Sequence, residues 1–382
     1  MPIRPLIRRA ITFAVALLLL GGTALAEEPP EAGDAVETPH RCRLEYTQSG
    51  INCENMVGYS DHAEPVFKKE PEYEGVAAKG LTSDGDNAVG YAWDQEARKL
   101  YIDANRNWDL TDDTPIELTG GGTWHFQERM NVRIDVPPKE GPRSYVLDVQ
   151  AMGPVFLTLR SGWQGDVRLY GRDWRITLAD LDLNGVFDSE DLCHVRPLDI
   201  EQPRVVTADL ADSVNYADRL FLDGHCYALA PEWTADGAID LALTEQAVEQ
   251  ALLEVRGEGL GFVLLEGGVT VMLWQPGPSV PVPCGIYNTQ QFMVDGGAAQ
   301  FAAQGWQPLR VNAEGAALEA GGPLTQKLSV SRNLARFSFS HAIQGVGGRI
   351  YEQIGGDYEN PPQVRVYDTE GKLLDECQFA YG

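Results

Sequence analysis

The sequence predicts an all-β protein: a β-rich N-terminal region with two acidic loops at strand ends, followed by a C-terminal immunoglobulin-like β-sandwich. Short runs of alternating apolar and polar residues recur from Val66 onward, and this period of two is typical of strands with one buried face. Glycine and proline, 40 and 23 residues of 382, separate the runs and mark turns. Two of the runs lead directly into stretches rich in aspartate and asparagine.

The first 26 residues are expected to be a cleaved secretory signal peptide. Three arginines precede the apolar run ITFAVALLLL, and an Ala-Leu-Ala cleavage site ends at residue 26. The apolar run is short for a bilayer-spanning helix, which disfavours a membrane anchor. We therefore expect a secreted or periplasmic protein of the bacterial envelope that begins at Glu27 and has no membrane span after cleavage.

Residues 27–60 are expected to form a polar leader and a turn closed by a disulfide. The leader EEPPEAGDAVETPH is polar and contains proline, the composition of a mobile segment. Six cysteines follow the signal, and an even number in an exported chain indicates disulfides. The pairings that we expect are Cys42–Cys53, Cys193–Cys226 and Cys284–Cys377. Alternatively, Cys193-His194 and His225-Cys226 suggest a zinc site, although their spacing fits no compact zinc motif.

A β domain is expected at residues 61–202. Its alternating runs are NVRIDV, SYVLDV, VFLTL, DVRLY and WRITL. In two hairpins, AVGYAW–DQEAR–KLYIDAN and DVRLY–GRD–WRITLAD, the second strand leads straight into an acidic loop. These loops begin at Asp103 and Asp180, 77 residues apart. The repetition indicates either an internal duplication or two uses of one favourable turn.

Residues 203–275 are expected to form a β-rich connecting domain with strands at RLFLDG, CYALAP, LGFVLLE and VTVMLW. One segment, TEQAVEQALLEVRG from Thr244, fits two structures. As a helix it would place Val248, Ala251, Leu252 and Val255 on one face and end at Gly257. As a strand it would continue the surrounding pattern.

An immunoglobulin-like β-sandwich is expected at residues 276–382. The stretch PGPSVPVPCG, from Pro276, has the composition of a linker. After it, short strands such as IYNTQQFMV, ARFSFS and QVRVYD alternate with turns over about a hundred residues, as in sandwich domains. We expect this segment to fold alone.

The chain is strongly acidic, with a formal net charge of −26. Nucleic acid is therefore excluded as a partner, because phosphate binding requires positive charge. Nearly all of the excess acid lies before Pro276, in the part that contains both acidic loops.

The loop DLDLNGVFDSED, residues 180–191, has the oxygen pattern of a calcium site. A 12-residue calcium loop supplies ligands from positions 1, 3, 5, 7, 9 and 12, with glycine at position 6 for the sharp turn. Gly185 holds position 6. The ligand positions are held by Asp180, Asp182, Asn184, the Val186 carbonyl, Asp188 and Asp191.

This pattern resembles the loops of EF-hands, dockerins and thrombospondin type 3 repeats, which implies a bound calcium ion. The resemblance covers only the loop. The preceding WRITL alternates as a strand, so the helix pair of an EF-hand is not implied. Leu181 and Leu183, apolar at intervening positions, fit a loop that is held against a core.

The loop DANRNWDLTDD, residues 103–113, is a weaker version of the same pattern. Trp108 replaces the glycine, Thr114 replaces the last carboxylate, and Asp112 or Asp113 would have to substitute for it. Its candidate ligands are Asp103, Asn105, Asn107, the Asp109 carbonyl and Thr111. The stretch LYIDANRNWDLTDD also resembles loops of uncharacterised, exported, β-rich bacterial proteins, a likeness that implies no activity. Alternatively, both loops are turns in which Asp and Asn side chains bond their own backbone.

The predicted function is that of an exported, calcium-stabilised, non-enzymatic binding or scaffolding protein whose partners are calcium and a protein or glycan of the cell envelope. The sequence contains no H-E-x-x-H, G-x-S-x-G or P-loop motif. The alternative is a carbohydrate-active protein, either a glycan-binding module or a glycoside hydrolase. The chain has eight tryptophans, including Trp93, Trp124, Trp163 and Trp174. Exposed tryptophans lining one groove would favour the glycan-binding module. Two carboxylates facing each other across a cleft would favour the hydrolase. A third possibility is a domain that presents partners to each other.

Overall fold

The computed structural model describes residues 39–48, 56–57, 65–82, 88–120, 126–135, 142–151, 155–200, 213–295, 299–305, 307–333, 336–355 and 363–378. These residues belong to one compact unit, Thr38–Gly382. Their regular structure consists of 31 β-strands and one 3₁₀ turn, Val346–Gly348, which confirms the all-β prediction. Within the described ranges no helix has the length and apolar character that a membrane crossing requires.

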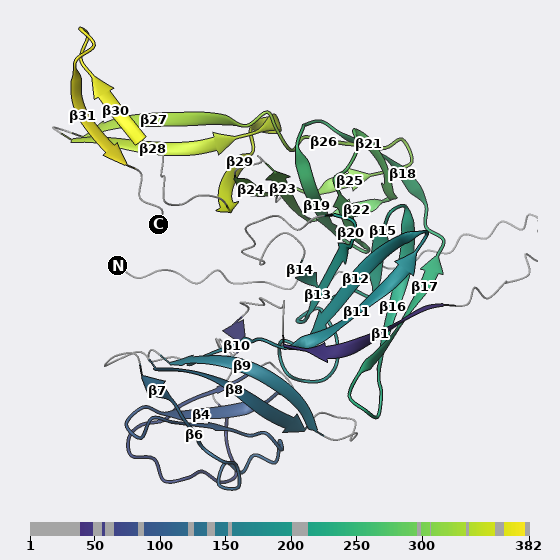
Figure 1. Ribbon diagram of the computed structural model, residues 1–382, viewed down its shortest axis with the longest axis vertical. Helices are drawn as coiled ribbons and strands as arrows, with labels where there is room; N and C mark the ends of the chain where they lie inside the picture. Colours follow the sequence, from purple (N-terminus) through teal and green to yellow (C-terminus); the bar gives the residue numbers. More distant parts are fainter. Residues whose placement is uncertain are drawn as a thin grey trace, which may run out of the picture. The chain divides into compact units, whose positions relative to one another are not determined.

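Two small antiparallel sheets belong to the N-terminal part of the chain (Figure 1). The four-stranded sheet has the order β3 (Ala78–Leu81), β4 (Gly90–Asp94), β5 (Lys99–Ile102) and β6 (Ile116–Glu117). The five-stranded sheet has the order β2 (Met56–Val57), β10 (Val155–Leu159), β9 (Pro142–Ala151), β8 (Phe126–Asp135) and β7 (Thr119–Gly120). The first acidic loop connects β5 to β6.

The largest sheet has 15 strands. In spatial order its strands are β14 (Ser213–Asn215), β13 (Leu192–Pro197), β12 (Arg172–Ala179), β11 (Gly162–Leu169), β1 (His40–Thr47), β17 (Ile239–Gln246), β16 (His225–Trp233), β15 (Arg219–Leu222), β20 (Thr270–Trp274), β19 (Leu260–Glu266), β23 (Thr289–Asp295), β24 (Gln300–Gly305), β29 (Ile350–Gly355), β28 (Arg336–Gln344) and β27 (Thr325–Asn333). Strand β1 joins two parts of this sheet, because its first residues pair with β17 and its last residues pair with β11.

Three further groups of strands complete the fold. One sheet has the order β21 (Ser279–Pro283), β18 (Gln250–Val255) and β26 (Ala316–Leu318). The other two are pairs: β22 (Gly285–Tyr287) with β25 (Leu309–Val311), and β30 (Gln363–Tyr367) with β31 (Leu373–Gln378).

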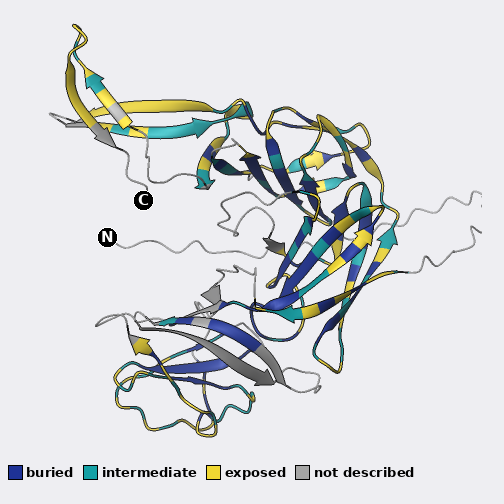
Figure 2. Cartoon of the chain, in the orientation of Figure 1, coloured by how far each residue is buried: buried dark blue, intermediate teal, exposed yellow. Residues whose placement is uncertain are grey.

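The middle of the long sheet is buried on both faces. Along β19, Phe262 and Leu264 face one hydrophobic core, whereas Val263 and Leu265 face a second. Successive side chains of a strand point to opposite faces, so a strand between two cores needs a continuous apolar run, as LGFVLLE supplies. Figure 2 shows the contrast between these buried strands and the exposed β27.

The segment from Thr244 forms strands and no helix. Strand β17 ends at Gln246, and β18 begins at Gln250. In β18 the buried and exposed residues alternate strictly: Ala251, Leu253 and Val255 are buried, whereas Leu252 is 62% exposed. This period of two is that of a strand, so the helix that the sequence also allowed is wrong.

The expected boundary at Pro276 does not coincide with a break in strand pairing. Strand β18, before the boundary, pairs with β21 and β26, which lie after it. Strand β19 likewise pairs with β23. The second core combines residues from both sides, including Leu253, Val282 and Tyr287. These contacts argue against independent folding of residues 276–382.

The expected disulfide between Cys193 and Cys226 is wrong, because both residues are free, buried thiols. Cys193 faces the first hydrophobic core and Cys226 the second, so their sulfur atoms point into different layers. Cys42 and Cys284 are also free. Cys53 and the side chain of Cys377, their expected partners, lie outside the described residues.

Candidate metal centre

The second acidic loop, Asp180–Asp191, connects two paired strands of the long sheet. Ala179 at the end of β12 lies opposite Leu192 at the start of β13, which holds the two ends of the loop together. Leu183, fully buried, and Leu181, 8% exposed, both belong to the first core. Because these leucines are held in the core, the neighbouring Asp180 and Asp182 are buried as well.

Three carboxylates of this loop converge in the interior. Asp180 and Asp191 are fully buried and Asp182 is 6% exposed. One oxygen of each lies within 4.8 Å of the others. Among the described residues, this is the one group of three or more Asp, Glu, His or Cys side chains with the spacing of metal ligands, and it contains no Cys or His. The structure therefore contains a buried, all-oxygen cluster that could hold a metal ion.

Backbone amides and one tyrosine hold the carboxylates in place. Asp191 accepts hydrogen bonds from the Leu181 amide at 2.7 Å and from the Asp188 amide at 3.0 Å. Asp180 Oδ2 accepts one from the Gly185 amide at 2.9 Å and another from the Tyr145 hydroxyl. Asp180 Oδ1, in contrast, is buried and has no hydrogen-bond partner among the described residues. A buried charged oxygen without a partner is costly, so this atom marks where a cation would bind.

The electrostatics of the cluster favour a cation or protons. Burial, with a further contribution from the Asp182 carboxylate, raises the pKa of Asp180 to about 7. Burial and the Asp180 carboxylate raise the pKa of Asp191 to about 9. Both shifts have the same cause: negative charge is unfavourable in a dry site next to like charge. A bound cation would remove that penalty.

Not all predicted ligands join the cluster. Asn184 donates to Asp182 at 2.6 Å and accepts from the Val186 amide, also at 2.6 Å. The Val186 side chain is 48% exposed. Asp188 is exposed, and its carboxylate accepts a hydrogen bond from the Glu190 amide at 2.8 Å. Of the six predicted positions, the structure brings together the carboxylates of positions 1, 3 and 12.

The first acidic loop repeats the backbone conformation of the second. In both loops the amide at position 6, Trp108 or Gly185, donates to the aspartate at position 1, Asp103 or Asp180. The amide at position 5 bonds the side chain at position 3, and the amide at position 7 bonds the side chain at position 5. The φ angle at position 6 is positive in both, 64° and 78°. Trp108 thus adopts a conformation that usually requires glycine.

The predicted ligands of the first loop bond within the protein. Asp103, 1% exposed, accepts from the Asn107 and Trp108 amides. Asn105 and Asn107 both donate to Asp112, and Asp109 accepts from Thr111. The Lys69 ammonium pairs with Asp109 and holds the pKa of that carboxyl at about 2. Most of these contacts are typical of a turn in which Asp and Asn side chains bond the backbone and each other. Asp113 differs, because its Oδ2 atom is buried without a hydrogen-bond partner among the described residues and burial raises the pKa of its carboxyl to about 6.

Two residues of the centre were missed by sequence reasoning. Tyr145, on β9, is fully buried, and its hydroxyl donates to Asp180. Arg106, in the first loop, donates from its guanidinium to the Leu183 carbonyl in the second. They lie 35 and 77 residues from their partners along the chain. Tyr145 lies in a predicted strand and Arg106 in the first acidic loop, but neither pattern indicates a contact with the second loop.

Three of the four tryptophans named above as candidates for sugar stacking are buried. Trp93, Trp163 and Trp174 are each 1% exposed and fill the first core. Trp124 lies outside the described residues. The three buried carboxylates are also a poor match for a glycoside hydrolase, whose acid pair flanks an accessible cleft at separations of about 5 to 9.5 Å.

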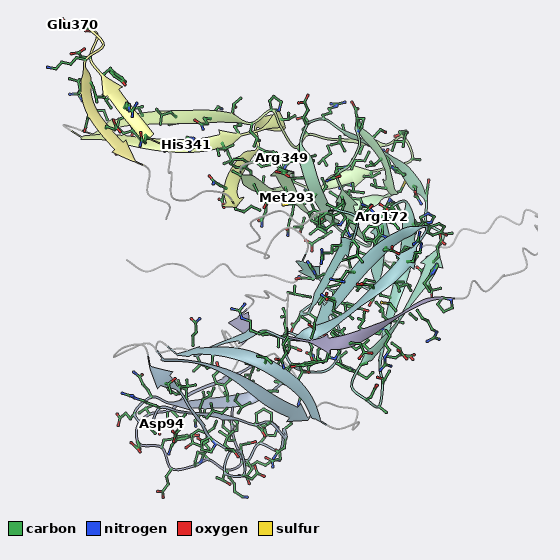
Figure 3. All side chains as sticks on the ribbon, viewed as in Figure 1. Asp94, Arg172, Met293, His341, Arg349 and Glu370 are labelled. Atoms are coloured by element: carbon green, nitrogen blue, oxygen red, sulfur yellow. The ribbon has the colours of Figure 1, made fainter. Side chains whose placement is uncertain are left out.

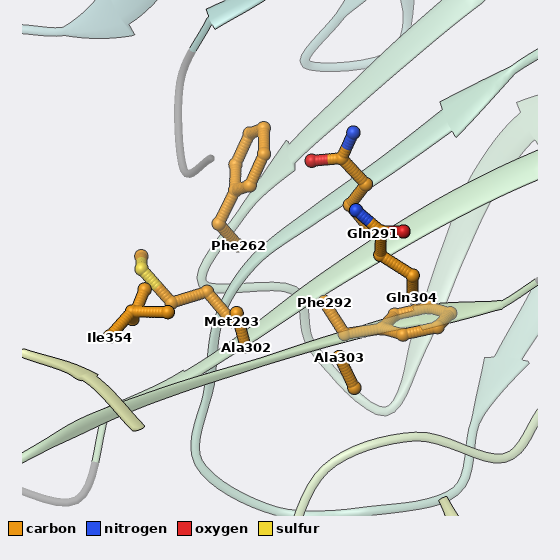
Figure 4. A pocket seen from close by; sticks show the side chains of 8 residues that line it. All are labelled: Phe262, Gln291, Phe292, Met293, Ala302, Ala303, Gln304 and Ile354. Carbon is orange, nitrogen blue, oxygen red and sulfur yellow. The ribbon is translucent and has the colours of Figure 1, made fainter. Parts of the chain in front are cut away.

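Among the described residues, other polar groups form ion pairs and hydrogen bonds nearer the surface, such as the Glu245 carboxylate with the His225 ring at 2.8 Å. Arg172, labelled in Figure 3, pairs with Asp199 at 2.9 Å and Asp223 at 3.0 Å and lies over the Trp174 ring. The pocket in Figure 4 contains no ionisable side chain and has room for about one water molecule. It is lined by Phe262, Gln291, Phe292, Met293, Ala302, Ala303, Gln304 and Ile354. The aspartate cluster therefore remains the strongest candidate site.

Comparisons with protein-family models, with curated proteins and with solved structures returned no match.

Proposed function

We propose that the chain is an exported, calcium-stabilised β protein that acts by binding or scaffolding in the bacterial envelope, and that calcium binds at Asp180, Asp182 and Asp191. One observation carries the metal part of the proposal. The Asp180 Oδ1 atom is buried, faces no hydrogen-bond donor in the described chain, and belongs to a cluster of three carboxylates. A divalent cation would neutralise most of the charge of such a cluster.

The choice of calcium rests on the donor atoms. Every carboxylate of the cluster offers oxygen, and nitrogen and sulfur donors are missing from it. Zinc and copper prefer imidazole or thiolate ligands, whereas calcium binds six to eight oxygens in a flexible arrangement. Magnesium demands a strict octahedron and retains its water. The positions 1, 3 and 12 that converge are also those where calcium loops place carboxylates.

Calcium would act here as a structural cross-link. The cluster lies where β12 ends and β13 begins, and Asp180 is joined to β9 through Tyr145. An ion at this point would stabilise contacts between the long sheet and the five-stranded sheet. An ion that binds the folded state but not the unfolded state raises the free energy of unfolding. Above the Kd, this increase grows with the logarithm of the ion concentration.

Titration calorimetry on chelator-treated protein tests the proposal. We expect one calcium site with a Kd of about 10⁻³ M or tighter. Asp191→Asn should weaken binding at least about 100-fold, because it removes a ligand charge without changing the shape of the side chain. Asp188→Asn is the matched control, since Asp188 lies in the same loop but outside the cluster, and its affinity should stay within about threefold of the parent.

Two results would overturn the proposal. The first is the absence of calcium-dependent heat in the parent protein. The second is equal loss of affinity in the Asp188 and Asp191 variants, which would place the ion elsewhere in the loop.

A further inference from the structure

The first acidic loop places a positive charge on the candidate metal centre. Arg106 Nη2 donates a hydrogen bond to the main-chain carbonyl of Leu183. Leu183 stands between Asp182 and Asn184, so the guanidinium rests against the backbone of the second loop. Both residues hold the fourth position of their loops, with φ angles of 56° and 63°. The residues at the fourth positions of the two loops are therefore in contact.

The surroundings of Arg106 are acidic and partly dry. Burial lowers the pKa of its guanidinium, and Tyr145, Asp180, Asp182 and Asp103 each oppose that change. An arginine remains charged under these conditions, because its ordinary pKa is above 12. Arg106 thus contributes a fixed positive charge next to the carboxylates of the second loop.

We propose that Arg106 sets the net charge of the metal centre and thereby its preference for divalent ions. With a cation bound, the three carboxylates are ionised and carry −3, and Arg106 reduces the total to −2. One divalent ion neutralises this total, whereas a trivalent ion leaves an excess positive charge in a buried site. The inference rests on the proposed metal binding, and it assigns to the first loop a role in tuning the second.

The physical consequence is a charge-dependent effect. The repulsion between Arg106 and a bound ion is proportional to the charge of the ion. Removal of Arg106 should therefore strengthen the binding of every cation, and trivalent ions should gain more than divalent ions. A purely structural role for Arg106 predicts the opposite, since loss of its hydrogen bond would loosen the loop and weaken both.

Titrations of calcium and terbium into the parent protein and Arg106→Gln provide the test. We expect calcium to bind about tenfold tighter in the variant and terbium about 30-fold tighter. The electrostatic potential of Arg106 is the same for both ions, but it acts on two positive charges in calcium and on three in terbium. Calcium is followed by calorimetry and terbium by luminescence sensitised by Trp233, whose Nε1 donates to the Gly185 carbonyl at 2.7 Å.

Arg106→Lys is the matched control, because lysine keeps the positive charge but lacks the planar guanidinium group. Its affinities should stay within about threefold of the parent. Melting curves check that each variant is folded, and Arg106→Met replaces Arg106→Gln if the latter does not fold.

The outcomes separate the two proposals. If the parent binds calcium but Arg106→Gln binds both ions equally well or more weakly, the role of Arg106 is refuted and calcium binding stands. If neither ion binds any variant or the parent, the metal centre itself is refuted, and the role of Arg106 with it.

Discussion

At the scale of single residues, Asp180 and Asp191 couple stability to pH. Their pKa values in the folded chain, about 7 and about 9, exceed the value near 4 of an aspartate in an unfolded chain. The protonated carboxyls therefore contribute stability that is full below about pH 4 and is lost as the pH rises through about 7 and then about 9. Calcium should replace this contribution at high pH, because it stabilises the ionised form.

Melting temperatures measured from pH 5 to pH 9 test this coupling. With chelator present, we expect the melting temperature to fall as the pH rises. With calcium in excess the fall should be much smaller. Asp180→Asn, which mimics the protonated carboxyl, should flatten the chelator curve relative to the parent. A chelator curve that is flat or rises in the parent would show that the cluster is not held by protons.

The ligands themselves could be predicted in part. Asp180, Asp182 and Asp191 follow from a local spacing, because a loop with glycine at position 6 brings positions 1, 3 and 12 together. Tyr145 and Arg106 could not be predicted, since they reach the site through tertiary contacts that leave no trace in a local pattern. Asp188 fits the spacing, yet its carboxylate bonds the Glu190 amide, which shows that the pattern does not decide between a ligand and a turn.

At the scale of strands, the alternation of side chains predicted most of the elements. NVRID, SYVLDV and WRITL lie in β8, β9 and β12, as expected. Which strands pair could be predicted only for neighbours in hairpins. The pairing of β1 with both β11 and β17 joins segments more than 100 residues apart, and it depends on the packing of the whole chain.

The change of partner along β1 depends on a glycine. Leu44 pairs with Ile239 on β17, and Glu45 pairs with Gln164 on β11. A Cβ atom on Gly165 would lie 2.3 Å from the Arg43 carbonyl oxygen and 3.0 Å from Leu44 Cδ2. Gly165→Ala should therefore destabilise the protein by about 1 to 3 kcal/mol, because the backbone of one strand must shift.

Urea denaturation of Gly165→Ala measures this cost. Gly268→Ala is the control, because nothing lies within 4 Å of its added Cβ atom, and it should change stability by less than about 0.5 kcal/mol. Equal stability of the two variants would mean that the strands around β1 tolerate a side chain at Gly165.

At the scale of the whole molecule, the long sheet makes residues before and after Pro276 depend on each other. A fragment of residues 276–382 would lose the partners of β21, β23 and β26 and half of the second core. We expect it to show no cooperative thermal transition by circular dichroism, although the composition at Pro276 suggests a linker. Cooperative melting of the isolated fragment would show that its own strands suffice.

Anomalous X-ray diffraction from crystals grown with calcium tests whether the buried carboxylates hold a divalent cation. We expect an anomalous peak about 2.4 Å from Asp180 Oδ1, with oxygens of Asp182 and Asp191 at similar distances. A well-ordered loop with no peak among these three side chains, or a peak found only at the first loop, would refute the proposed calcium centre.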